Sequence, residues 1–208
     1  MKTLQQSLIW MLLLGASTLW AQNQEVEFDI YTTSAAKASR YLLADEVALR
    51  DCPSAQCEQL TTLRIGTYVR LLAKSESPQT INDVCSRWYK IKMGPQIGWI
   101  WGGLISQKTM VSHADPEVKF VFGEAGVDGL SRKQYQIRAI KDGEELDRVL
   151  FRAYALAPSH VNLEINAADG SEILAIQREG DSTLVLNFEN GYFSEREVYP
   201  SVAQTMAE

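Results

Sequence analysis

Side chains that could carry covalent or metal chemistry are few in this chain of 208 residues. The cysteines are Cys52, Cys57 and Cys85, and the histidines are His113 and His160. A cysteine peptidase needs a reactive thiolate beside a histidine, and a zinc site needs three or four closely spaced ligands. Neither histidine has a second histidine or a cysteine near it in the sequence. We therefore expect no catalytic residue, no metal site and no cofactor, and we predict that the protein is not an enzyme.

The spacing of the cysteines favours a disulfide bond instead. Cys52 and Cys57 flank a Pro-Ser-Ala-Gln segment that is typical of a turn, so a bond between them would close a small ring. Cys85 is the alternative partner of either residue, and three unpaired thiols are the remaining possibility. We predict the Cys52–Cys57 bond, because the chain begins like an exported protein and an oxidising compartment preserves disulfides.

Residues 1–21 have the features of a signal peptide. Lys2 supplies a positive charge, an apolar stretch runs from Leu8 to Leu14, and Ala21 offers a small residue at the cleavage point. An uncleaved anchor is the alternative, although the stretch is short for a membrane span. We expect a periplasmic or secreted protein with no integral membrane span after cleavage.

The overall charge narrows the choice of partners. Lysine and arginine number 20 against 26 acidic residues, a net charge of −6. Nucleic acids and anionic lipids are bound by cationic surfaces that neutralise phosphate. We therefore expect no nucleic-acid partner.

Two further motifs have simple structural interpretations. Glycines spaced three apart from Gly123 to Gly129 lack the Lys-Ser/Thr ending of a phosphate-binding loop, so they predict a flexible loop between strands. The carboxylate pairs Glu144/Glu145 and Glu195/Glu197 are typical of solvated faces.

The first half of the chain predicts short strands. Alternating Val26, Phe28 and Ile30 predict a leader strand, with a small polar linker after it, over residues 22–40. Residues 41–106 predict five strands separated by glycine, proline and polar segments, which is typical of a small barrel. The five strands are expected at Leu42–Leu49, Leu60–Leu63, Tyr68–Ala73, Trp88–Lys92 and Gly98–Leu104. A polar loop is expected from Lys74 to Asn82, and residues 107–117 are expected to be a linker.

Residues 118–199 predict a second, β-rich domain. Alternating apolar residues are interrupted by Asp142-Gly143, Asp169-Gly170 and Asn190-Gly191, dipeptides that favour tight hairpins because they tolerate positive φ. The spacing predicts an antiparallel meander or sandwich. A helix over Glu144–Tyr154 is the weaker alternative, and residues 200–208 are expected to form a tail.

Four ordered motifs in residues 41–106 resemble those of the bacterial SH3 (SH3b) domain. The motifs are Leu49-Arg50-Asp51-Cys52-Pro53-Ser54, Gly66-Thr67-Tyr68-Val69, Trp88-Tyr89-Lys90-Ile91, and Gly98-Trp99-Ile100 with Leu104. The segment before Trp88 is longer than in the family, and Cys52 stands where a small residue is common. The resemblance implies a mainly β fold, with a small SH3-like barrel followed by the β-rich domain. Its core would hold Leu49, Val69, Leu71, Ile91 and Ile100. The C-terminal region is loosely similar to β-rich domains that follow SH3b modules.

The resemblance also implies a binding surface. Trp99 and Trp101 are two residues apart, so on a strand they share one face and Ile100 takes the other. In SH3-like barrels, aromatic side chains on such faces form a groove for an extended peptide. The candidate ligand-binding residues are Trp88, Trp99, Trp101, Tyr68 and Tyr89. The alternative is that the tryptophans pack inside the fold or against the second domain.

SH3b modules in cell-wall enzymes resemble targeting devices for peptidoglycan peptides. We therefore expect an exported, non-enzymatic binding module that recognises a cell-wall peptide or an envelope protein. The alternative is a structural accessory subunit of an envelope assembly, with the barrel packed on the C-terminal domain. An enzyme with an unrecognised site is a third hypothesis, and it would need a cleft that gathers His160 with acidic residues.

Overall fold

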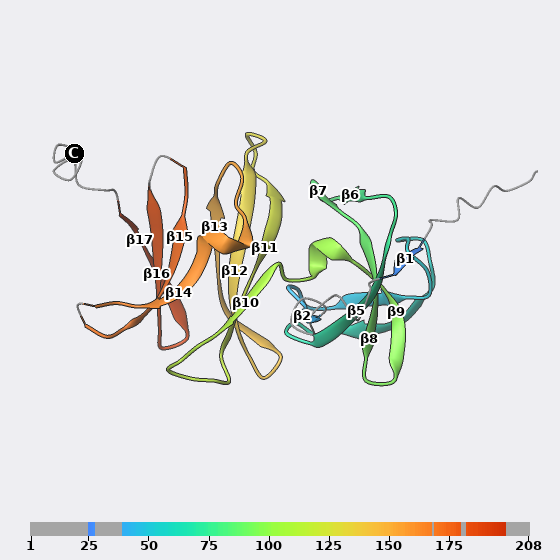
Figure 1. The fold of residues 1–208 in the computed structure, drawn as a ribbon, viewed down its shortest axis with the longest axis horizontal. Coiled ribbons are helices and arrows are strands. Elements are labelled where there is room, and N and C mark those ends of the chain that lie inside the picture. Colours follow the sequence, from blue (N-terminus) through green and yellow to red (C-terminus); the bar gives the residue numbers. More distant parts are fainter. Residues whose placement is uncertain (1–24, 28–38, 168, 180–181, 199–208) are drawn as a thin grey trace, which may run out of the picture.

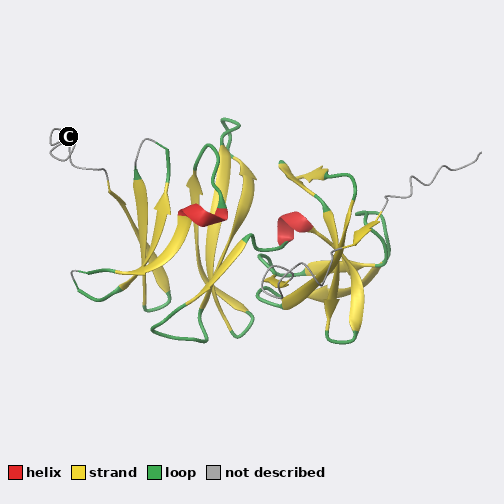
Figure 2. Cartoon of the chain, in the orientation of Figure 1, coloured by secondary structure: helices red, strands yellow, loops and turns green. Residues whose placement is uncertain are grey.

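The computed structural model describes residues 25–27, 39–167, 169–179 and 182–198. The predicted signal peptide, most of the leader segment and the tail lie outside these residues. Most of the described chain is strand, arranged in three antiparallel sheets and one small hairpin, so the prediction of a mainly β fold is confirmed (Figures 1 and 2). Two short 3-10 helices, η1 (Gly102–Leu104) and η2 (Pro158–His160), interrupt the strands.

The first sheet has seven strands in the order β1-β5-β8-β9-β3-β4, with β2 also paired to β5. Its strands are β1 (Glu25–Glu27), β2 (Ser39–Tyr41), β3 (Val47–Arg50), β4 (Gln59–Leu63), β5 (Tyr68–Ser75), β8 (Trp88–Met93) and β9 (Gln96–Trp101). The prediction of one strand over Leu42–Leu49 is wrong. Glu46 has a positive φ of 52°, which interrupts the extended backbone, and strand β3 begins only at Val47.

In the first sheet, the side chains that were predicted to point into the core do so. Ile91 and Ile100 are 0 % exposed, and they share a core with Leu49, Val69 and Leu71. Side chains alternate along a strand, so the indoles on either side of Ile100 lie on the opposite face.

The C-terminal part consists of two four-stranded meanders. One contains β10 (Lys108–Val111), β11 (Lys119–Val127), β12 (Lys133–Lys141) and β13 (Glu144–Arg152). The other contains β14 (Val161–Ile165), β15 (Glu172–Gln177), β16 (Thr183–Glu189) and β17 (Tyr192–Val198). The meander prediction is confirmed, and φ is positive at all four residues of the turns Asp142-Gly143 and Asn190-Gly191.

Two local expectations in this part need correction, and the weaker alternative of a helix over Glu144–Tyr154 is excluded. Residues 144–152 form β13, along which Asp147, Val149 and Phe151 are more buried than the residues between them, as in a half-exposed strand. The expected linker contains β10, whose backbone pairs with β11. Gly123 and Gly126 lie within β11, where a bulge at Glu124/Gly126 accommodates the extra residue, and only Gly129 lies in the turn that follows.

The two meanders pack face to face around one apolar core. Phe120 lies at its centre, 5.2 Å from Phe188 and 5.9 Å from Phe193 between ring centroids. Buried residues come from both sheets: Phe122, Tyr135, Ile137 and Phe151 from one, and Val161, Leu174, Ile176, Leu184 and Leu186 from the other. The C-terminal part is therefore a β-sandwich.

A separate buried cluster joins the first sheet to the sandwich. Leu43 and Ile65 from the N-terminal half pack against Val121 of β11 and Ile140 of β12. All four side chains are at most 4 % exposed. In Figure 1 the blue-to-green half of the chain lies beside the yellow strands of the sandwich.

Each edge strand of one sheet of the sandwich lies next to an edge strand of the other sheet. On one side, the backbone N–H of Phe193 in β17 donates to Asp147 of β13 at 2.7 Å. On the other side, Lys108 of β10 reaches Asn162 of β14, with 3.2 Å between Nζ and Oδ1. Arg178 forms an ion pair with Glu197 at the β17 edge. The first two contacts bridge the edge strands of the two sheets, whereas the ion pair lies within the sheet of β14–β17.

At the upper end in Figure 1, Asp128 organises the turn between β11 and β12. Its Oδ1 accepts the backbone N–H groups of Leu130 and Arg132, each at 2.9 Å. Its Oδ2 lies 2.8 Å from both Arg132 and Arg152. The backbone hydrogen bond from Arg132 is the main reason why the pKa of Asp128 falls from 3.8 to about 2.

Candidate functional site

The three tryptophans expected to line a groove are buried. Trp88, Trp99 and Trp101 are 3 %, 6 % and 6 % exposed. They form one cluster with Val84, and Ile81 packs against it. The covering residues belong to a hairpin of β6 (Gln79–Ile81) and β7 (Val84–Ser86). The expectation of an exposed tryptophan face is therefore wrong, because this hairpin occupies it.

Hydrogen bonds hold the hairpin on the indoles. Trp88 donates through Nε1 to the side-chain oxygen of Gln79 at 2.6 Å. Trp101 donates through Nε1 to the backbone oxygen of the same residue at 3.4 Å. At the hairpin tip, Asn82 reaches the sandwich, where a Cβ on Gly126 would lie only 2.8 Å from its backbone oxygen. The tryptophans thus seat a structural hairpin that contacts both halves of the protein.

The two predicted tyrosines do not join the tryptophan cluster. Tyr68 is 54 % exposed, and its ring lies edge-on to Tyr41 with 5.3 Å between centroids. The hydroxyl of Ser75 accepts the backbone N–H of Trp88. Tyr68 lies seven residues before Ser75 in β5, a separation of about 23 Å along an extended strand. Tyr89 is half-buried against the core of the first sheet. The five predicted residues therefore do not form one surface.

The predicted disulfide is confirmed. Cys52 and Cys57 are bonded, with 5.6 Å between their Cα atoms, and Cys85 is an exposed free thiol. Within the described part of the chain, the cluster with metal-ligand spacing consists of Asp51 and these two bonded cysteines. Sulfur in a disulfide is not the thiolate that binds zinc, so this cluster is explained by the bond.

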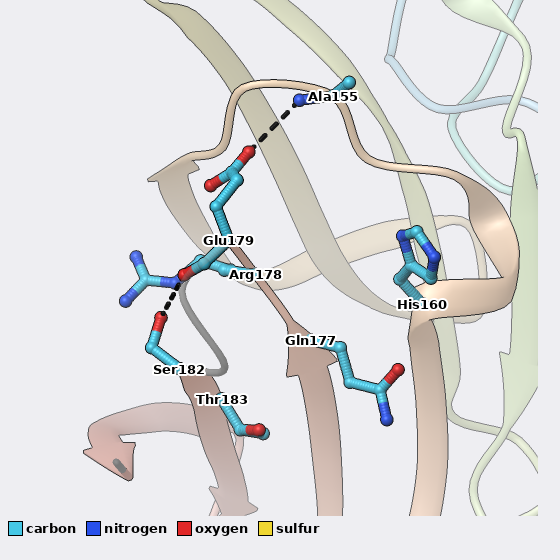
Figure 3. Close-up of a pocket in the computed structure, with 7 residues that line it drawn as sticks. All are labelled: Ala155, His160, Gln177, Arg178, Glu179, Ser182 and Thr183. Atoms are coloured by element: carbon cyan, nitrogen blue, oxygen red, sulfur yellow. Dashed lines mark hydrogen bonds between the residues drawn. The ribbon is translucent and has the colours of Figure 1, made fainter. Parts of the chain in front are cut away.

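His160 lines a pocket of about 460 Å³ (Figure 3), at the end of the sandwich where the chain passes from β15 to β16. Glu179 is in the same pocket, but its carboxylate accepts the backbone N–H groups of Tyr154 and Ala155, the latter at 3.2 Å. Desolvation raises the pKa of Glu179, whereas these backbone hydrogen bonds and that of its own N–H lower it, and the net direction is downward. The carboxylate therefore stays ionised and ties two segments together.

Two other polar side chains of this pocket, those of His160 and Ser182, also make structural hydrogen bonds. His160 Nδ1 accepts the backbone N–H of Ala157 at 3.4 Å, and Ser182 donates to the backbone oxygen of Glu179 at 3.3 Å. In Figure 3 His160 and Glu179 stand on opposite sides of the pocket. No hydrogen bond among the described residues links His160 to Ser182, Thr183 or Glu179. The pocket thus gathers a histidine with an acid, as the enzyme hypothesis requires, but lacks the nucleophile–base contact of catalysis.

A larger cleft of about 720 Å³ opens at the other end of the sandwich. Its apolar lining comes from both sheets: Val118 and Leu146 from one, and Ile165 and Phe188 from the other. Loops that join successive strands of each meander supply the polar rim, at the lower end in Figure 1. The polar lining residues are Ser112, His113, Asp115, Lys141, Ser171, Glu172, Glu189 and Asn190.

Two hydrogen-bonded groups shape the rim of this cleft. Lys141 lies 2.9 Å from Asp115 and 3.0 Å from Glu117, and its hydrogen bond to Asp115 is the main reason why the pKa of Lys141 rises and that of Asp115 falls. Glu172 accepts the hydroxyl of Ser112 and the backbone N–H of His113, both at 2.6 Å. These contacts fix the loop of residues 112–118 across the ends of both sheets.

Sequence reasoning missed the cleft. The turn dipeptides at Asp142-Gly143 and Asn190-Gly191 were a usable signal, since in a meander alternate turns fall at one end. Which loops of the two sheets meet there depends on how the sheets pack.

No protein-family model, no curated protein and no solved structure matches the chain. No helix in the described ranges is long and apolar enough to cross a membrane. Function is therefore inferred from the geometry of the cleft and from the arrangement of the sheets.

Proposed function

We propose that the protein is an exported binding protein without catalytic activity, which recognises a cell-wall peptide or another envelope protein. The disulfide between Cys52 and Cys57 is compatible with an extracellular or periplasmic location. The ordered motifs of residues 41–106 support an SH3b-type module in the N-terminal half. The observation that carries the proposal is the cleft at the end of the sandwich.

The cleft has the composition expected of a binding site. Ligand sites in proteins have volumes of about 300–1,000 Å³ and combine an apolar lining with a few polar groups, and this cleft measures about 720 Å³. Ile165 and Leu146, one from each sheet, are 54 % and 38 % exposed. An exposed apolar pair at the mouth of a polar-rimmed cleft gains free energy when a partner covers it.

We therefore place the proposed binding surface on the sandwich and not on the tryptophans. Buried indoles that hold a hairpin cannot contact a ligand unless that hairpin leaves. The N-terminal sheet then acts as a support, packed on the outer face of β11 and β12.

A structural accessory subunit is the second candidate, and the packing of the two halves favours it. Leu43, Ile65, Val121 and Ile140 are buried between the first sheet and the sandwich, as that hypothesis expects. In this case the cleft would be one part of a permanent assembly contact. Chemical cross-linking in intact cells distinguishes the two, because a permanent subunit gives one stoichiometric product.

Retention on purified peptidoglycan and on immobilised envelope extract tests the proposal. Ile165→Ser removes an exposed apolar side chain from the cleft. Leu60→Ser is the matched control, because Leu60 is 51 % exposed on β4, in the other half of the protein. We expect wild type and Leu60→Ser to be retained equally and Ile165→Ser at least fivefold less. Equal retention of all three proteins, or no retention of the wild type, would contradict the proposal.

A further inference from the structure

The charges around the cleft are unbalanced. Three carboxylates line it, those of Asp115, Glu172 and Glu189, against one ammonium group, that of Lys141. The ammonium group is already matched by Asp115 and by Glu117, just outside the lining. A ligand that enters the cleft therefore meets excess negative charge.

Glu189 is the most accessible of these carboxylates. It is exposed at the end of β16, directly before the Asn190-Gly191 turn, and no ion pair to it is found among the described residues. Glu172, by contrast, is only 9 % exposed at its side chain and is held by Ser112 and His113. Glu189 can thus reorient toward a bound cation, while Glu172 supplies a fixed negative charge.

The apolar lining limits what kind of cation suits the cleft. A small hydrated cation would leave Ile165, Leu146 and Phe188 uncovered. A lysine or arginine side chain has an apolar stem with a charge at its tip, so it can cover such a surface while its charge reaches the rim. A neighbouring aliphatic side chain would fill the volume between the two sheets.

We propose that the cleft binds a basic, partly apolar segment of a partner protein, with an aliphatic side chain between the sheets and lysine or arginine at the rim. This inference rests on the proposed binding function and specifies its ligand class. Opposite charges at the rim would speed association and select against acidic segments.

Fluorescence anisotropy with three labelled peptides tests the inference. The peptides are Lys-Ile-Lys-Leu-Lys and its two analogues with every lysine replaced by glutamine or by glutamate. We expect the lysine peptide to bind at least fivefold more tightly than the glutamine peptide, and the glutamate peptide to bind most weakly. Raising the salt concentration from 0.05 M to 0.5 M should reduce this preference, because screening weakens exposed charge pairs.

Two variants locate the peptide on the protein. Glu189→Gln should weaken binding of the lysine peptide about two- to fivefold, the range of an exposed ion pair, and should leave the glutamine peptide unaffected. Ile165→Ser should weaken both. Glu58→Gln, which removes an exposed carboxylate from the other half of the protein, should change neither.

The outcomes separate this inference from the proposed function. If lysine and glutamine peptides bind equally and Ile165→Ser weakens both, the cleft binds a ligand but the charge argument is overturned. If no peptide binds while Ile165→Ser still loses retention on envelope material, the basic-segment inference is again overturned and the binding function stands. If neither peptides nor envelope retention respond to Ile165→Ser, both fail.

Discussion

Replacing Trp101 by alanine decides whether the tryptophan face is structural or exposed. The indole is 6 % exposed, and its ring is so close to Gly103 that a Cβ there would lie 2.2 Å from it. A buried tryptophan removes roughly 150–250 Å² from water, which at about 25 cal/mol per Å² corresponds to about 4–6 kcal/mol. Measured truncations of large aromatic residues cost about 3–5 kcal/mol, so we expect a loss of about 4 kcal/mol.

The loss is measured by urea unfolding followed by far-UV circular dichroism, with thermal unfolding as a second assay. For a chain of this size each kcal/mol shifts the Tm by about 2–4 °C, so the melting temperature should fall by roughly 8–16 °C. An exposed groove tryptophan would change the free energy of unfolding by only about 0.5 kcal/mol. Tyr68→Ala is the control at an exposed aromatic, with an expected loss of about 1 kcal/mol or less.

A loss below about 1 kcal/mol for Trp101→Ala would refute the buried cluster. The same result together with lost retention on envelope material would return the binding surface to the tryptophans. If Trp101→Ala instead unfolds at a lower urea concentration, but its folded fraction is still retained on envelope material, the structural role of Trp101 is supported.

Three further changes test other parts of the fold. Cys52→Ser/Cys57→Ser should lower the free energy of unfolding by about 2 kcal/mol, because the ring is short; peptide mapping without reduction should find this bond in the wild type, and a bond to the third cysteine would contradict the structure. Gly126→Ala should cost about 1–3 kcal/mol in thermal unfolding, because φ is +95° and the methyl group would lie 2.8 Å from a backbone oxygen. Gly129→Ala is the control, because a Cβ there would meet no atom within 4 Å, and it should leave the stability unchanged. Equal losses of stability in the two variants would contradict the close contact between Gly126 and the backbone of Asn82. The lowered pKa of Asp128, about 2 against 3.8, stabilises the fold above about pH 4, and this contribution is lost as the pH falls toward 2. Asp128→Asn should therefore flatten the acid limb of a pH–stability curve, and an unchanged limb would contradict the turn geometry.

Much of the sheet structure could be predicted from local patterns. Alternation placed Ile91 and Ile100 in a core, and turn dipeptides marked the hairpins of the sandwich, because both depend on neighbours in the sequence. The short spacing of Cys52 and Cys57 likewise constrained their pairing.

The expected binding face failed because its covering element was not recognised. Lys74 to Asn82 was expected to be a polar loop, but β5 extends to Ser75 and residues 79–86 form a hairpin. Its turn uses Asn82 and Asp83, both with positive φ, and no glycine marks it. Strand phase tells which residues share a face, whereas burial depends on what packs over that face.

The cleft could not be predicted for a related reason. Val118, Leu146, Ile165 and Phe188 lie far apart in the sequence, and they meet only because two separate meanders pack face to face. Each looks like an ordinary strand or loop residue by itself. The contact between the first sheet and the sandwich, through Leu43 and Val121, depends on the same long-range packing.

The paired edges of the sandwich bear on how the protein behaves at high concentration. A free strand edge is a template on which another chain can add a strand and begin an aggregate. On β17, Glu195 and Glu197 alternate with Arg196, and Arg178 is paired with Glu197. An incoming strand would have to strip water from these charges, which costs free energy that a few backbone hydrogen bonds do not recover. The ion pair at this edge should therefore keep the folded protein monodisperse, and its loss should appear first as intermolecular sheet growth.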